Sequence, residues 1–200
     1  MALRAVVFDI GGVLEHNVDD GERRWLEQLG LSKDEFSRRM TPISQAGAVG
    51  EIDLAEAERR IAAAFALDDV DLRAFMEDIW TDYVGTLNEP VATYFASLRG
   101  RYRTGIVSNS FVGARERELP HGFEEMCDVL VYSHEVGCAK PDPTIYLMAC
   151  ERLRVRPREA LFVDDGPNNV AGARAIGMEA IQFTDSEQAL AEVRARLDRG

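Results

Sequence analysis

The sequence predicts an α/β fold in which a parallel sheet carries helices on both faces and a small helical bundle interrupts the sheet after its first strand. Short apolar runs typical of buried strands alternate with amphipathic helical segments in the second half of the chain. The roughly seventy residues that follow Leu14 show only helical periodicity. These two patterns indicate one α/β core with a helical insertion.

The first strand is predicted at residues 6–8, and it ends at Asp9. Open α/β folds bind their ligands at the carboxyl edge of the sheet, so Asp9 is a candidate site residue. Gly11 and Gly12 follow, and they allow a sharp turn and a close approach of the backbone to an anion or a metal ion. The alternative is an aspartate that only begins a turn.

The inserted segment is predicted to be helical throughout, with no strand. One helix ends at Gly30, and Ser32 caps the next. Asp53 and Glu56 form a capping-box pattern ahead of a third helix, and an apolar stripe over residues 72–83 marks a fourth. The segment is therefore expected to form a bundle with a core of its own.

The sheet is predicted to resume after Asn88. Further strands are expected at residues 104–107, 129–132, 160–163 and 179–183, with helices at 91–98, 143–153, 169–176 and 190–197. This alternation requires right-handed crossovers and therefore a parallel sheet. We expect an α/β core domain of residues 1–15 and 88–200 and an inserted helical domain of residues 16–87.

Composition excludes several classes of partner. The net charge of −12 argues against nucleic acid and anionic membranes, because both favour a basic face. No apolar run is long enough to span a bilayer, and the first strand begins at once, so we expect no signal peptide. Three cysteines, an odd number without a CxxC pair, favour reduced thiols in a cytoplasmic protein.

Polar residues follow the predicted strands at the point where each ends. Asp9, Ser108 and the pair Asp164 and Asp165 come directly after strands, and Lys140 lies a short loop beyond another. Because the carboxyl ends of parallel strands share one edge, these side chains are expected to converge. A carboxylate can attack phosphorus, while a hydroxyl and an ammonium group bind the phosphoryl oxygens. The adjacent aspartates would repel each other without a cation, which favours a divalent ion.

Four segments together resemble the successive motifs of the haloacid dehalogenase-like (HAD) hydrolase superfamily: FDIGGVL, IVSNS, GCAKPDPTIY and FVDDGPNNVAGARAIGM. The inserted helices resemble its C1-type cap, and the resemblance implies a Rossmann-like core. Gly50-Glu51-Ile52 and KPDPTIY look most like bacterial phosphatases that act on glucose 1-phosphate. The resemblance thus implies a small phosphorylated substrate and Mg²⁺.

Roles for individual residues follow from this resemblance. Asp9 would be the nucleophile and a metal ligand, together with the backbone carbonyl of Gly11. Asp165 would bind the metal directly and Asp164 through water. Ser108 and Asn109 would bind the phosphoryl group, and Lys140 would pair with Asp9 and phosphate. Two supporting residues are also implied: Gly12 in the first motif and Asn169 in the fourth.

One position departs from the family pattern. Phosphatases of this superfamily carry a second aspartate two residues after the nucleophile, where this chain has Gly11. General acid–base catalysis contributes about 10²–10⁴-fold to rate. Three alternatives follow: a phosphatase that uses a good leaving group or borrows Glu15 or His16; a metal-independent 2-haloacid dehalogenase with Asp9 as its nucleophile; and a regulatory or binding module. The Asp164–Asp165 pair argues against the dehalogenase.

Overall fold

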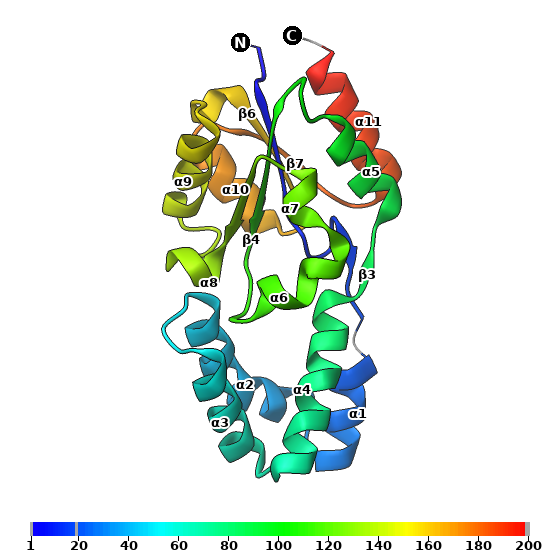
Figure 1. Cartoon of the computed structure of the whole chain (residues 1–200), viewed down its shortest axis with the longest axis vertical. Helices are drawn as coiled ribbons and strands as arrows, with labels where there is room; N and C mark the ends of the chain where they lie inside the picture. The colour runs from blue at the N-terminus through cyan, green and yellow to red at the C-terminus, as the bar shows by residue number, and fades with distance from the viewer. Residues whose placement is uncertain (1, 19, 199–200) are drawn as a thin grey trace.

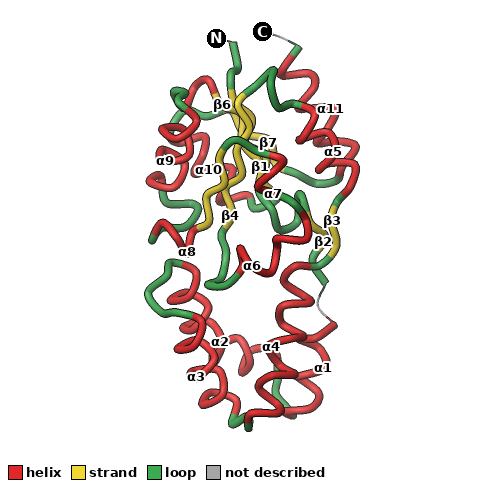
Figure 2. Tube along the Cα trace, viewed as in Figure 1, coloured by secondary structure: helices red, strands yellow, loops and turns green. Residues whose placement is uncertain are grey.

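A computed structural model describes residues 2–18 and 20–198 of the chain and shows two lobes stacked end to end (Figure 1). All strands of the main sheet lie in one lobe, and the other lobe is built from helices (Figure 2). Both chain ends lie at the far end of the sheet lobe (Figure 1). The helical lobe therefore faces the opposite end of the sheet.

The described residues form one main sheet of five parallel strands in the order β5-β4-β1-β6-β7. The strands are β1 (Ala5–Phe8), β4 (Arg103–Ser108), β5 (Val129–Tyr132), β6 (Ala160–Asp164) and β7 (Glu179–Gln182). The first strand lies at the centre, and all four of its residues are buried. Burial on both faces explains why β1 and β6 contain continuous apolar runs rather than alternating ones.

Helices cover both faces of this sheet, which confirms the predicted fold class. Val6 and Phe8 point into one core with α5 (Glu89–Ser97), α7 (Phe123–Met126) and α11 (Ser186–Leu197). Ala5 and Val7 point into the opposite core with α9 (Pro143–Leu153) and α10 (Pro167–Ala175). Successive residues of a strand face opposite sides, so β1 anchors both cores. The shorter elements are α6 (Ala114–Glu118), η1 (Leu119–His121), α8 (Ser133–Val136) and η2 (Pro157–Glu159).

The helical lobe contains α1 (Asp20–Leu29), α2 (Lys33–Ala48), α3 (Leu54–Phe65) and α4 (Asp69–Val84), as predicted. Ser32 and Asp53 cap α2 and α3 by accepting hydrogen bonds from the amides of Glu35 and Glu56. The lobe has its own apolar core around Phe36, Phe65 and Phe75. Helices too short to be stable alone are held by this shared burial.

A two-stranded antiparallel ribbon joins the lobes, and the expectation of no strand after Leu14 is wrong on this point. The ribbon pairs β2 (Glu15–His16) with β3 (Thr86–Leu87). Two-residue strands are too short to show any periodicity, and their pairing joins residues far apart in the chain. Among residues 2–18 and 20–198, no helix combines the length and the apolar character that crossing a membrane requires.

Candidate active site

A buried lysine lies between two aspartates at the carboxyl edge of the central strands. Lys140 Nζ is 2.6 Å from Asp9 Oδ1 and 2.7 Å from Asp164 Oδ2. Asp9 follows β1 and Asp164 ends β6, and these two strands are neighbours in the sheet. The Lys140 side chain is 0% exposed, so the charge is stabilised by the two carboxylates rather than by water.

Asn109 holds the backbone of Lys140 in place. Its side-chain amide donates to the Lys140 carbonyl at 2.8 Å and accepts from the Lys140 amide at 2.7 Å. Both ends of the Asn109 amide are therefore engaged by one residue of another loop. In the structure Asn109 positions Lys140, and its predicted contact with a phosphoryl group stays a prediction.

Asp164 is almost fully occupied by hydrogen bonds. Its Oδ1 accepts hydrogen bonds from the amide of Gly166 at 2.8 Å and from Asn169 Nδ2 at 2.9 Å. Its Oδ2 accepts a hydrogen bond from Lys140 Nζ. The carbonyl of Asn169 in turn accepts from the Tyr146 hydroxyl at 2.9 Å. Asn169 thus holds Asp164 from the first turn of α10, and its implied supporting role stays a prediction.

The remaining carboxylate oxygens suit a hard divalent cation. One oxygen from each of Asp9, Asp164 and Asp165 lies within 4.8 Å of the others. Asp9 Oδ1 is used by Lys140 and the Ile10 amide, which leaves Oδ2 available. Asp165 is exposed at the same edge, and Mg²⁺ typically binds one or two carboxylates, substrate oxygens and water. The residues therefore fit Mg²⁺, and the predicted roles of Asp9 and Asp165 as direct ligands stay predictions.

Gly12 has a steric reason to be glycine. A Cβ added there would lie 2.4 Å from Asp165 Oδ2, and the residue has a φ of 72°. The left-handed backbone favours glycine, and a side chain here would displace the Asp165 carboxylate. Gly12 thereby lets the first and fourth motifs meet, and its supporting role stays a prediction.

The electrostatics of Asp9 depend on its burial. Desolvation raises the pKa of Asp9 to about 7; Lys140 opposes this increase and Asp164 adds to it. Burial and Asp164 likewise raise the pKa of Asp165. A cation bound among these groups would favour their ionised forms, and ionised Asp9 is the nucleophilic form.

Ser108 ends β4, the other neighbour of β1, and is buried at 3% exposure. The structure thus brings Asp9, Ser108, Lys140, Asp164 and Asp165 to one edge, as the topology of a parallel sheet predicts. The predicted roles of Ser108 in phosphoryl binding and of the Gly11 carbonyl in metal binding stay predictions.

Asn17 is a site residue that sequence reasoning missed. Its Oδ1 accepts from the Gly12 amide at 2.9 Å, and its Nδ2 donates to the Tyr83 carbonyl at 3.1 Å. It ties the first-motif loop to the end of α4 in the helical lobe. A single asparagine in a loop carries no pattern, so no sequence signal marked it.

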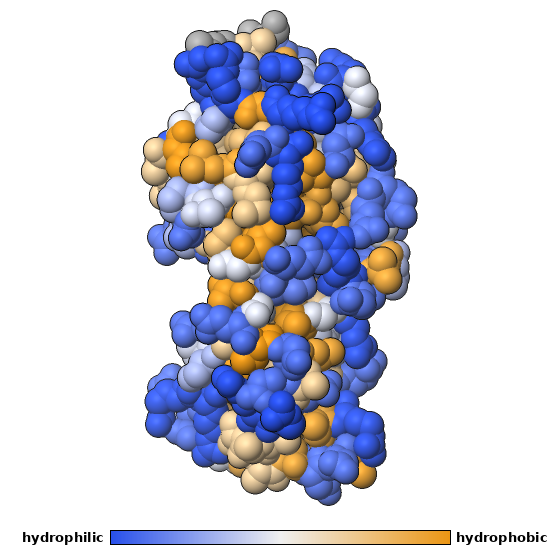
Figure 3. Space-filling model, turned by 60° about the vertical axis from the view of Figure 1, so that its left-hand side comes forward, coloured by the Kyte–Doolittle hydropathy of each residue, from blue (hydrophilic) through white to orange (hydrophobic). Residues whose placement is uncertain are grey.

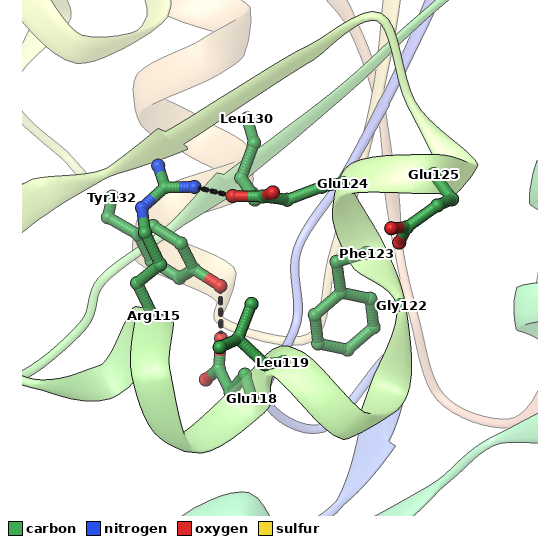
Figure 4. A pocket seen from close by; sticks show the side chains of 9 residues that line it. All are labelled: Arg115, Glu118, Leu119, Gly122, Phe123, Glu124, Glu125, Leu130 and Tyr132. Carbon is green, nitrogen blue, oxygen red and sulfur yellow. Dashed lines mark hydrogen bonds and ion pairs between the residues drawn. The ribbon is translucent and has the colours of Figure 1, made fainter.

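Two buried glutamates, Glu15 and Glu118, lie beside the site; Glu15 is a candidate borrowed acid from the sequence, but its contact with His121 and the burial of Glu118 were not predicted. Glu15 is 1% exposed, and its Oε1 is 2.5 Å from His121 Nδ1. Glu118 is 2% exposed and accepts a hydrogen bond from the Tyr132 hydroxyl, while Arg115 pairs with Glu124 nearby (Figure 4). Burial raises the pKa of Glu15 to about 9 and that of Glu118 to about 7.

Replacing Glu15 by glutamine is expected to stabilise the protein at alkaline pH. Between the ordinary value of 4.5 and about 9, the folded protein keeps the Glu15 proton that the unfolded chain has lost. The free energy of unfolding therefore falls as pH rises through this window, and a neutral glutamine removes that fall. At about pH 8 we expect a gain of roughly 5 kcal/mol in urea unfolding, and little gain near about pH 5. The exposed Glu27→Gln change is the control; equal pH profiles for parent and Glu15→Gln would contradict the assignment.

The chain matches one protein family model and is similar to several known proteins. The family model for haloacid dehalogenase-like hydrolases matches residues 3–177. Phosphatase MT3486 from Mycobacterium tuberculosis is 32% identical over 94% of this chain and 90% of its own length. D-ribitol-5-phosphate phosphatase from Bacteroides thetaiotaomicron is 28% identical over 90% of this chain and 91% of its own length. The chain spans only 19% of the mouse acyl-CoA dehydrogenase family member 10, at 29% identity over 97% of this chain.

Solved structures agree on the fold. A predicted HAD-like family hydrolase from Porphyromonas gingivalis superposes with a TM-score of 0.77 and 25% identity. The match covers 100% of both chains, so it includes the helical lobe as well as the sheet.

Proposed function

The chain belongs to the haloacid dehalogenase-like hydrolases, and from this premise we propose that it is a Mg²⁺-dependent phosphatase of small phosphate monoesters. The observation that supports the proposal most is the buried Lys140, which contacts Asp9 and Asp164 beside the exposed Asp165. The ammonium group of Lys140, held against the nucleophilic carboxylate, offsets the repulsion between that carboxylate and an incoming phosphate dianion. The two relatives named as phosphatases support the same reaction.

Asp9, Lys140 and Ser108 have different roles in the proposed reaction. Asp9 Oδ2 attacks phosphorus, the Asp9–phosphorus bond forms, and the bond from phosphorus to the ester oxygen breaks. Lys140 and the Ser108 hydroxyl bind the phosphoryl oxygens as charge develops on them. Water then attacks the aspartyl-phosphate, releases inorganic phosphate and restores Asp9. Asp9, Asp164 and Asp165 would hold Mg²⁺, which would supply charge neutralisation at the phosphoryl group when bound.

Gly11 restricts the substrates that this site can turn over. With no side chain at this position, the leaving oxygen receives no proton from the residue that normally supplies it. The reaction therefore favours esters whose alcohol leaves easily as an anion. An anomeric sugar phosphate meets this requirement, in keeping with the sequence resemblance.

Release of inorganic phosphate from a panel of phosphate monoesters tests the proposal. We expect turnover with Mg²⁺ and its loss when EDTA removes the metal, restored by adding Mg²⁺ back. Short 2-haloacids are assayed in parallel for halide. Halide release that EDTA does not affect would instead assign the dehalogenase reaction, and turnover of neither class would assign a binding role.

A further inference from the structure

An apolar cavity lies between the two lobes, next to the proposed active site. It has a volume of about 230 Å³. Its walls come from α2, α3 and α4 of the helical lobe and from the loop that follows β4. That loop contributes Asn109, Ser110 and Phe111, directly after Ser108. Hydrophobic residues are also visible at the narrow waist between the lobes in the space-filling view (Figure 3).

The cavity wall is connected to the nucleophile through two contacts. Asn109 lines the cavity and also holds the backbone of Lys140, whose ammonium group contacts Asp9. Asn109 directly follows Ser108, so the cavity begins one residue from the serine that is proposed to bind the phosphoryl group. A substituent that extends from this phosphoryl group past Asn109 would enter the cavity.

The chemistry of the walls selects against a polar substituent. The helical lobe contributes mainly apolar side chains: Met40, Ala48, Ile61, Met76, Ile79 and Trp80. Burying the hydroxyl groups of a sugar against such walls would leave them without partners, which costs free energy for each group. An apolar ring, by contrast, gains from leaving water, and an apolar cavity of about 150 Å³ is already large enough to hold benzene.

Trp80 supplies an aromatic side chain to the cavity wall. Trp80 also packs near Phe111 and Tyr83, with ring centroids 6.1 and 5.4 Å away. This aromatic wall suits a planar ring.

We propose that the substrate is an aryl phosphate, the phosphate monoester of a phenol, whose ring occupies this cavity. The inference rests on the proposed phosphatase function and combines two features of the chain. The cavity takes an apolar ring, and a phenol leaves as a stable anion without the proton that Gly11 cannot supply. An anomeric sugar phosphate also has a leaving group that departs easily, but its hydroxyl groups do not suit the apolar cavity.

The test uses phenyl phosphates with a hydrogen, methyl, ethyl or propyl group at the para position. These esters differ in apolar size while their leaving groups have nearly the same acidity. We expect kcat/KM to rise about fourfold for each added carbon until the cavity is full. A para-hydroxymethyl group should give no such gain over methyl, and glucose 1-phosphate should be a poor substrate.

A cavity-filling variant ties the preference to this cavity. Ser44 lines it from α2, and Ser44→Leu should flatten the para-alkyl series while phenyl phosphate is still hydrolysed. Gln45 is exposed on the same helix, so Gln45→Leu is the matched control and should leave the series unchanged. Unequal effects of these two variants separate occupation of the cavity from a general effect on the helix.

Binding supplies a readout that does not need turnover. The affinity of para-alkyl phenylphosphonates, which cannot be hydrolysed at the ester position, is measured by calorimetry with Mg²⁺ present. We expect the same gain for each carbon and its loss in Ser44→Leu. Phosphate release that is equal across the series, or greatest for the sugar phosphate, would overturn this inference alone. Phosphonate binding without phosphate release from any ester would overturn the proposed phosphatase function and leave the cavity assignment intact.

Discussion

Replacing Asp9 by asparagine is expected to abolish phosphate release, with a loss of about 10⁴-fold or more in kcat, as when the nucleophile of another covalent hydrolase is removed. The amide oxygen carries no negative charge and does not form a stable ester with phosphorus. The change also removes one of the two carboxylates that contact Lys140, at 2.6 Å, so phosphate binding is expected to change as well. Single-turnover phosphate release measures the chemical step directly.

The fold of this variant should survive. Asparagine keeps the shape of aspartate, and its oxygen can still accept from the Ile10 amide, which is 2.8 Å from Asp9 Oδ1. Lys140 keeps its contact with Asp164 at 2.7 Å, so its charge is not left without a partner. Thermal melting and circular dichroism check this point. Asp69 is exposed at the start of α4, and Asp69→Asn should retain full activity. If Asp9→Asn kept more than about a tenth of the parent rate, Asp9 would not be the nucleophile.

Much of the fold could be predicted because most of the longer elements carry their own local signal. β1 and β6 contain short apolar runs, and the caps at Ser32 and Asp53 make the hydrogen bonds that their sequence patterns predict. The convergence of Asp9, Lys140 and Asp164 follows from topology alone, since parallel strands expose their carboxyl ends on one edge. Local pattern and sheet topology together therefore locate the site.

The missed features depend on contacts between residues that are distant in the chain. The Asn17 side chain contacts the Tyr83 carbonyl 66 positions away, and Glu15 meets His121 across 106 positions. No periodicity or motif in the sequence indicates such pairs, because the contacts form only when the chain is folded. The same holds for the cavity: Met40 lies on α2 and Trp80 on α4, and only the tertiary structure brings them to one cavity wall.

Introducing an aspartate at position 11 is expected to increase activity on esters with poor leaving groups. For benzyl phosphate, whose alcohol needs a proton to leave, Gly11→Asp should raise kcat/KM by about 10²–10⁴-fold. Phenyl phosphate, whose leaving group needs little assistance, should change much less. The backbone can accept the side chain, because Gly11 lies outside the left-handed region that Gly12 occupies, and a Cβ there would meet only Asn17, at 3.4 Å.

The Gly11→Asn variant separates proton transfer from packing. Asparagine has the same shape as aspartate and makes the same approach to Asn17, but it cannot donate a proton as a carboxylic acid does. An activity gain limited to aspartate, and lost at pH values where that carboxyl group is ionised, identifies general acid catalysis. Equal activities for the two variants would contradict it. The selectivity of the parent chain for easily departing alcohols would then arise from the fit of the substrate between the lobes, and not from the side chain that residue 11 lacks.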